Sequence, residues 1–461
     1  MNVSTRDPDL AAARKAIPPE GILSPTYRAA TIGMVALISL IAFEALAVTT
    51  AMPTVARELD GLKLYALAFG GVLATSVVGM TLSGRWSDRR GPAPAIWTGL
   101  VAFVAGLLIA GFAMNMPTLL AGRLVQGFGA GCLYPALYVI VGRLYPDSLR
   151  PKVFASFSAG WVVPALIGPA ISGAVVEHVG WRWVFLAVPV LAVPAALALR
   201  GALASLAPPT HTPAEQHGRM LNAVGASVGA CLLFVAGQET GWLTVAILIP
   251  ALALLVGCGR QLLPKGTLSG ARGLPSVIAL RGIIASAFFG TEAFLPLMLS
   301  HEHDMSPTRA GLAISCGALG WFAGSWYQGH YAKITRQAII HRGTVAMLVG
   351  ATAAGLGTFA WMPVAASIAG WALCGLGMGM TYASVSVATL AMSSTEEQGS
   401  NSSALQLCES LTVSTTLALG GSLFAALLTI SYTAAFSANF IITALLALLG
   451  VLAAYRTNVP S

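Results

Sequence analysis

Apolar runs long enough to cross a lipid bilayer recur along almost the whole chain, from about residue 28 to residue 454. A helix needs about 20 mainly apolar residues to cross the hydrocarbon core. Hydrophobic residues make up 56% of the 461 residues, charged residues only 9%, and the mean hydropathy is +0.78. A soluble domain is not built from such a composition. The sequence therefore predicts an all-α membrane protein with many spans.

We predict fourteen spans, which divide the chain into a tail (1–27), a first half (28–203), a central linker (204–275), a second half (276–455) and a short tail (456–461). The runs at 220–238 and 242–259 are near the lower length limit, and we interpret them as a hairpin inside the linker. A twelve-span alternative with a re-entrant 220–259 segment stays open. The expected spans are about Arg28–Thr50, Tyr65–Ser83, Ala93–Met114, Pro117–Val141, Val153–Val176, Trp183–Leu203, Met220–Gln238, Trp242–Gly259, Ser276–Ser300, Arg309–Gln328, Thr344–Trp361, Val364–Met392, Ser403–Ile430 and Ala434–Ala454.

The basic residues are distributed very unevenly between the two sides that this topology creates. Nineteen of the 25 lysines and arginines fall in segments on the side of the termini and four in loops on the other side, while Arg123 and Arg281 lie inside spans. Cytoplasmic segments carry the excess of basic residues in membrane proteins. We therefore expect both termini in the cytoplasm, and the net charge of +8 needs no nucleic-acid partner to explain it.

A weak internal repeat relates the two predicted halves at an offset of 245 residues. The matches pair Leu67-Ala68 with Leu312-Ala313, Gly79 with Gly324, and Gly84 with Gly329. A parallel repeat of this kind is typical of transporters built from two six-helix halves. The hairpin is then an insert between the halves.

The charged stretch from Gly84 to Gly91 interrupts the second and third spans, and we predict that it is a short turn. A purely basic turn obeying the positive-inside rule would account for its arginines, including Arg90, but not for Asp88 or the glycines. The stretch resembles the signature loop of the major facilitator superfamily, Gly-x-x-x-Asp-Arg-x-Gly, through Gly84, Asp88, Arg89 and Gly91. The resemblance implies a latch that holds the two halves together on the cytoplasmic side.

Two further motifs follow in the order that this family has. The stretch Arg123-Leu-Val-Gln-Gly-Phe-Gly-Ala130 resembles its fourth-helix motif, although an arginine there can also snorkel to the interface. Gly168, Pro169 and Gly173 resemble the fifth-helix motif of its antiporters, with Ser172 in place of one glycine. We assign Gly160 and Pro164 to the same motif, while a generic kinked packing helix is the plain alternative.

Three acids lie inside predicted spans and are the candidates for proton coupling. Glu44 stands nine residues before Pro53, where the fourteen-helix drug:proton antiporters that the chain resembles carry an Asp. At 1.5 Å per residue Glu44 is about 24 Å from the cytoplasmic start of its span, a depth similar to that of Arg123, so we predict that the two pair. Glu292 is the acid of the second half, and Glu409 is the third candidate although it lies outside the family pattern.

The resemblance implies an exporter rather than an enzyme: proton-coupled efflux of lipophilic or cationic small molecules across a bacterial inner membrane, by a monomer without cofactor or metal. Export of a metabolite, siderophore or lipid, and a non-transporting sensor or scaffold, are the alternatives. The tract His301-Glu302-His303-Asp304 looks like a metal site, but a solvated loop explains it better. Buried acids can neutralise a cation and aromatic rings can stack on it. The substrate-binding candidates are Phe43, Glu44, Trp161, Phe288, Phe289, Glu292, Trp321 and Gln406.

Overall fold

The computed structural model describes residues 21–146, 149–206, 218–237, 239, 242–330, 334–393 and 398–458. Within these ranges the chain is helical and contains no strand. Residues 1–20 of the predicted N-terminal tail, residues 207–217 of the linker and residues 459–461 lie outside them.

Fourteen long helices are present in the described part of the chain, as predicted. Thirteen spans are long and apolar enough to cross a membrane, and α12, at 24 residues or about 36 Å, is long enough as the fourteenth. The short α8 (Arg200–Ser205) extends α7, and η1 (Leu62–Leu64) precedes α3. The long helices are α2 (Arg28–Glu58), α3 (Leu67–Arg90), α4 (Ala93–Gly111), α5 (Met116–Leu144), α6 (Arg150–His178), α7 (Arg182–Leu197), α9 (Arg219–Ala236), α10 (Trp242–Leu262), α11 (Leu274–Glu302), α12 (Pro307–His330), α13 (Arg336–Leu356), α14 (Val364–Ala391), α15 (Gln398–Leu427) and α16 (Tyr432–Ala454).

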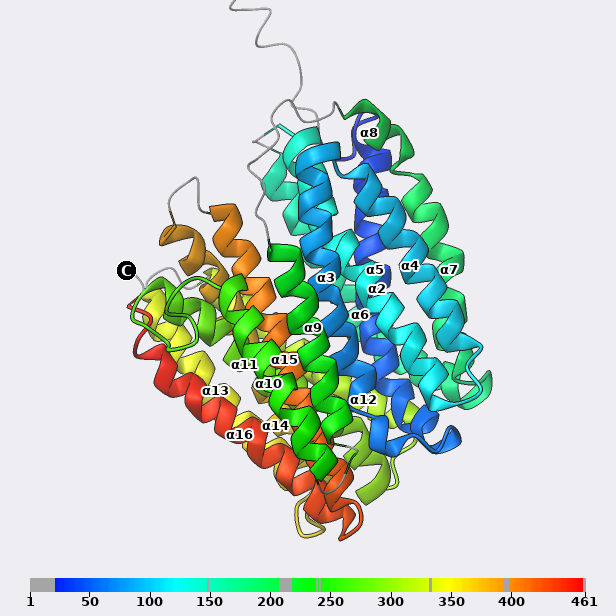
Figure 1. The fold of residues 1–461 in the computed structure, drawn as a ribbon, viewed down its shortest axis with the longest axis vertical. Helices are drawn as coiled ribbons and strands as arrows, with labels where there is room; N and C mark the ends of the chain where they lie inside the picture. The colour runs from blue at the N-terminus through cyan, green and yellow to red at the C-terminus, as the bar shows by residue number, and fades with distance from the viewer. Residues whose placement is uncertain are drawn as a thin grey trace, which may run out of the picture.

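The helices form two six-helix halves, α2–α7 and α11–α16 (Figure 1). In the first half α5 packs against α3 and α4, and in the second half α14 packs in the same way against α12 and α13. Gly79 and Gly324, which the internal repeat pairs, lie at equivalent helix contacts in the two halves. A Cβ on Gly79 would clash with the α5 backbone and a Cβ on Gly324 would clash with the α14 backbone. Small residues let these helices approach closely, as in other membrane bundles.

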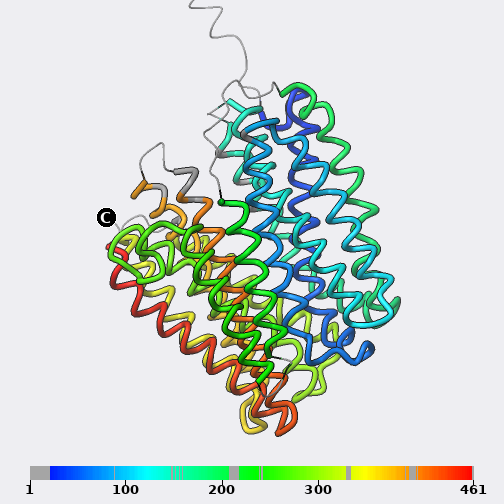
Figure 2. Tube along the Cα trace, viewed as in Figure 1, coloured from blue at the N-terminus to red at the C-terminus, as the bar shows by residue number. Residues whose placement is uncertain are grey.

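The inserted hairpin consists of α9 and α10, which lie side by side along the bundle between the two halves (Figures 1 and 2). With 18 and 21 residues the two helices are about 27 and 31 Å long, so each can span. Both segments are therefore full-length helices, as the fourteen-span topology expects. α9 contacts α3 and α15, one helix from each half, and Ser227 Oγ donates to the carbonyl of Ala74 at 2.6 Å. α10 packs mainly on α9 and leaves most of its surface exposed.

The stretch Gly84–Gly91 is not the turn that the sequence suggests. α3 continues through Arg90, and the link to α4 consists of Gly91 and Pro92 alone. Gly91 has a φ of +83°, a conformation that glycine adopts without strain. Polar residues extend a transmembrane helix easily once it has left the hydrocarbon, because they favour helix as much as turn there. For the same reason α13 begins at Arg336 rather than at Thr344.

The two ends of the bundle differ in how tightly the halves meet. We call the end where α2 begins and α16 ends the terminal end. Tyr65 at the start of α3 donates its hydroxyl to the carbonyl of Ala293 at 2.8 Å, and Ser414 Oγ donates to the carbonyl of Gly70 at the same distance. The Thr308 backbone N–H, at the start of α12, donates to Glu177 Oε1 at 2.9 Å. These contacts lie between the middle of the bundle and the end opposite the terminal end. In that region the two halves are therefore closed against each other.

Candidate functional site

Glu44 and Arg123 form an ion pair inside the first half. Arg123 comes from α5 and donates through Nη1 to Glu44 Oε1 on α2. The same guanidinium donates to Gln126 Oε1 at 2.7 Å and to the carbonyl of Ala68 at 3.0 Å. Both charged side chains are only 4% exposed. The pairing of Glu44 with Arg123, which was predicted from their similar depth in the membrane, is thus present in the structure. Each charge is neutralised by the other.

A second ion pair lies in the other half. Arg281 on α11 donates through Nε to Glu409 Oε2 on α15 at 2.8 Å, and through Nη1 to Ser386 Oγ at 2.9 Å. Its guanidinium lies 3.0 Å from the centre of the Tyr382 ring, a cation–π contact. The Tyr382 hydroxyl donates to Glu409 at 3.3 Å. Arg281 and Tyr382 had no assigned role in the sequence, and Glu409 gains a partner that sequence spacing did not reveal.

Glu292 differs from the other two acids because its carboxylate has no partner among the described residues. It lies on α11 and is partly exposed, and no ion pair or hydrogen bond to its carboxylate occurs among the described residues. Arg281 is eleven residues earlier on the same helix, about 16 Å along its axis. Glu292 is therefore an isolated carboxylate at membrane depth.

Aromatic side chains gather one turn from Glu292. Phe289 and Trp321 are partly exposed, with ring centroids 6.3 Å apart. Phe288 is only 2% exposed and stacks on the buried Trp371 at 4.6 Å. Phe288, a predicted substrate contact, therefore packs beneath the exposed rings of the cluster and is not itself accessible. Trp321 also contacts Tyr382 at 5.1 Å, which links this cluster to the second ion pair.

Aromatic residues of the first half face that ion pair from the other side. Tyr138 and Trp161 are each 39% exposed, and the ring of Tyr138 stacks on Phe154 at 5.2 Å. The hydroxyl of Tyr138 lies within electrostatic range of Arg281. Tyr134, which is partly buried, lies beside Trp161 and within electrostatic range of Glu409. Of these residues the sequence had suggested only Trp161, while the tyrosines at positions i and i+4 on α5 were the signal that was overlooked.

The other predicted contacts are dispersed. Phe43, partly exposed on α2, packs near Gly168 of α6. Gln406 is partly exposed one turn before Glu409 on α15. Among the described residues no group of three His, Cys, Asp or Glu side chains could hold a metal ion.

The glycines and prolines of α6 form the contact between the two halves near the opposite end. A Cβ on Gly173 would lie 2.6 Å from Cα of Thr308, and a Cβ on Gly311 of α12 would clash with the backbone of Pro169. Gly160 approaches Ser39 of α2, and Pro164 is buried in the same helix. The fifth-helix motif thus lets α6 and α12 touch backbone to backbone.

The predicted latch residues lie at the terminal end, on the last turns of α3. Arg89 and Arg90 are exposed, and Arg143 of α5 donates through Nη2 to the carbonyl of Ser87 at 3.1 Å. The side chain of Asp88 is outside the described part of the structure. The position of this helix end is thus fixed within the first half by Arg143, which the sequence analysis did not single out.

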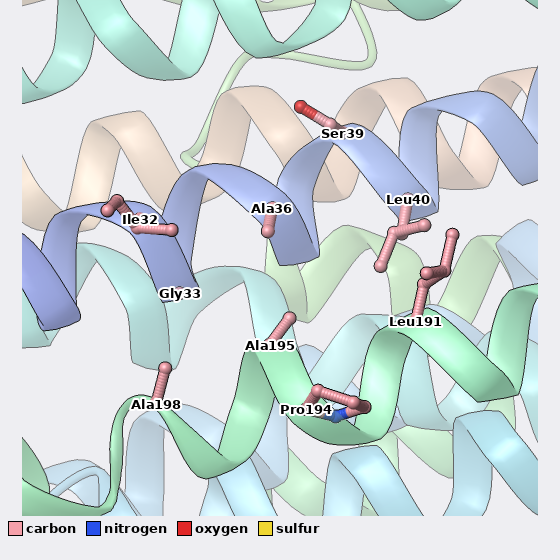
Figure 3. A pocket seen from close by; sticks show the side chains of 9 residues that line it. All are labelled: Ile32, Gly33, Ala36, Ser39, Leu40, Leu191, Pro194, Ala195 and Ala198. Carbon is pink, nitrogen blue, oxygen red and sulfur yellow. The ribbon is translucent and has the colours of Figure 1, made fainter.

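One surface groove lies between α2 and α7 and is shown in Figure 3. Its volume is about 480 Å³, and apart from Ser39 it is lined by apolar residues such as Ala36, Leu40 and Pro194. Ile32 and Leu191 at its rim are more than half exposed. With no charged group, this groove does not suit a cation, and the acids described above lie elsewhere.

Comparison with known proteins identifies the family. The model of the major facilitator superfamily matches residues 32–416. The chain belongs to the major facilitator superfamily. It is a multi-pass membrane transporter by family and fold, and this superfamily supplies the two-half architecture seen here.

Curated relatives of this facilitator match over about a third of the chain. The multidrug transporter protein MdtP of Bacillus subtilis is 31% identical over 153 residues, which are 33% of this chain and 28% of that protein. The efflux transporter aclA of Aspergillus oryzae is 37% identical over 139 residues, 30% of this chain and 25% of that protein. The matched segments thus span little more than a quarter of the relatives' length.

Solved structures share the fold over nearly the full length. A POT family transporter in complex with 5-aminolevulinic acid superposes with a TM-score of 0.72 at 16% identity, covering 94% of this chain and 97% of that one. An inward-facing bacterial homologue of the human lysosomal transporter Spinster gives a TM-score of 0.68 at 14% identity, covering 94% and 98%.

Proposed function

We propose that this facilitator is a proton-coupled exporter of lipophilic cations in a bacterial inner membrane, working as a monomer without a cofactor. The observation that carries the proposal is a set of carboxylates at membrane depth beside partly exposed aromatic rings. Ionisable groups inside a membrane are costly and mark substrate or proton pathways. Aromatic faces attract cations, most strongly where water is excluded.

The coupling acid is one of Glu44, Glu292 and Glu409, with Arg123 as the charge partner of Glu44. A carboxylate can hold either a proton or a cationic substrate, and competition between them exchanges one for the other. Several curated relatives carry multidrug or efflux in their names, which favours export of foreign compounds over export of a single metabolite.

The basic residues support the orientation. Their excess on the side of the termini supports a cytoplasmic location for the terminal end. The halves are then closed toward the outside. Tyr138 and Trp161 lie in the parts of α5 and α6 that are nearer the terminal end, from which an exported compound would enter.

A panel of compounds added to detergent-solubilised protein tests the proposal. The panel contains lipophilic cations, neutral analogues of similar shape and anionic metabolites, and the released protons are read with a pH dye in weak buffer. We expect release with the cations only. Binding of metabolites without proton release would favour the alternative exporter, and the absence of any binding would favour the non-transporting sensor.

A further inference from the structure

The charges inside the membrane do not balance, and the imbalance is one unit. Five side chains of the Asp, Glu, Lys or Arg type lie well inside the described spans: Glu44, Arg123, Arg281, Glu292 and Glu409. Two acids are paired with two arginines. Glu292 alone is left without a counter-charge.

From this count we propose that Glu292 is the exchange site and that it trades one proton for one monovalent lipophilic cation, so that the cycle moves no net charge. The proposal rests on the proposed function and deepens it by naming the acid, the valence of the substrate and the stoichiometry. At Glu292 the protonated acid releases H⁺ as the cation binds to the carboxylate. The reverse step on the other side releases the cation as H⁺ binds.

The surroundings of Glu292 explain why the exchange belongs there. An isolated charge in a low-dielectric interior is strongly disfavoured, so the carboxylate must hold a proton or a cation. On α14 the thiol of Cys374 lies within electrostatic range of Glu292. The other helices packed against α11, namely α2, α12, α13, α15 and α16, bring no charged group into such range among the described residues.

The other two acids suit the role less well. Glu44 is nearly inaccessible and already neutralised by Arg123, and Glu409 is neutralised by Arg281. A cation that bound to either acid would first have to displace an arginine that is held by further hydrogen bonds. Partners of a buried pair are costly to separate.

The aromatic rings near Glu292 favour cations that are flat and aromatic. Phe289 is one turn before it on the same face of α11, and Trp321 is the neighbouring ring from α12. Flat aromatic cations would therefore stack while their charge is neutralised by the carboxylate. A dication of the same shape would leave one positive charge without a partner.

Ethidium and propidium form the matched pair for the test, because both carry the same phenanthridinium ring but propidium has a second charge. Purified wild-type protein should release one proton per bound ethidium, and propidium should bind at least tenfold more weakly. Glu292→Gln should lose ethidium-induced release, while Glu302→Gln, at the solvent-exposed end of the same helix, should keep it. Glu292→Gln breaks no pair, so its thermal stability should not fall below that of the wild type.

The electrical prediction is tested in proteoliposomes. Ethidium movement in the wild type should follow a pH gradient and should not respond to a membrane potential imposed without one. A response to potential alone, or one proton still released per ethidium by Glu292→Gln, would overturn the assignment while leaving proton-coupled efflux intact. No proton release from the wild type with any cation of the panel would overturn the proposed function as well.

Discussion

Removing the charge of Glu44 should destabilise the protein, because Arg123 would keep a buried charge without a counter-ion. Both side chains are 4% exposed, so water cannot replace the lost carboxylate. Breaking a buried pair by removing one partner costs about 3–5 kcal/mol. With about 2.1 cal/mol/K of unfolding entropy per residue over 461 residues, Glu44→Gln should lower the melting temperature by about 3–5 °C.

The double variant Glu44→Gln with Arg123→Gln isolates the cause. It removes both charges and keeps groups that can form hydrogen bonds, so most of the lost stability should return. The control is Glu302→Gln, at the last residue of α11, where the side chain pairs with His301 near the surface; its effect should stay within about 1 kcal/mol. The assay is thermal unfolding of detergent-purified protein, followed by tryptophan fluorescence. A single variant as stable as the wild type, or a double variant less stable than the single one, would refute the reasoning.

The remaining predictions concern the latch, the hairpin and the aromatic cluster. Asp88→Asn should reduce transport several-fold without lowering the yield of folded protein; an unchanged transport rate would argue against a latch. A cysteine at Thr240, between α9 and α10, should react with an impermeant maleimide from the outer side, and labelling only from the cytoplasmic side would contradict a spanning hairpin. Trp321→Leu should weaken ethidium binding by about 0.5–2 kcal/mol, or about 2–30-fold, as measured by fluorescence titration. Trp326→Leu, on the same helix at a side chain that is 51% exposed, should leave ethidium binding unchanged, and equal effects of the two substitutions would exclude a specific ring contact.

The pairing of the helices into halves could be predicted from the internal repeat, and the number of helices from length and hydropathy alone. The same holds for the depth of a residue within a span, which placed Glu44 near Arg123. The ends of helices were less predictable. Residues 84–90 are polar, but they continue α3, since a helix that leaves the bilayer need not stop there.

Which residues on different helices face one another could not be predicted from the sequence. A helix that is apolar on all sides carries no pattern to fix its rotation, unlike an amphipathic surface helix. Arg281 and Glu409 are 128 positions apart and meet only through the packing of α11 against α15. For the same reason the sequence could not show that Phe288 is buried while Phe289 is partly exposed.

In the proposed cycle a proton gradient drives the export of a lipophilic cation. The most direct measurement uses purified protein in proteoliposomes, with ethidium fluorescence reporting its transport and an ionophore that exchanges K⁺ for H⁺ as the control. A pH gradient across the vesicle membrane should drive ethidium toward the more acidic side, and the ionophore should abolish this movement. Ethidium movement that is unaffected by collapse of the pH gradient, or no movement beyond that of protein-free vesicles, would contradict the account.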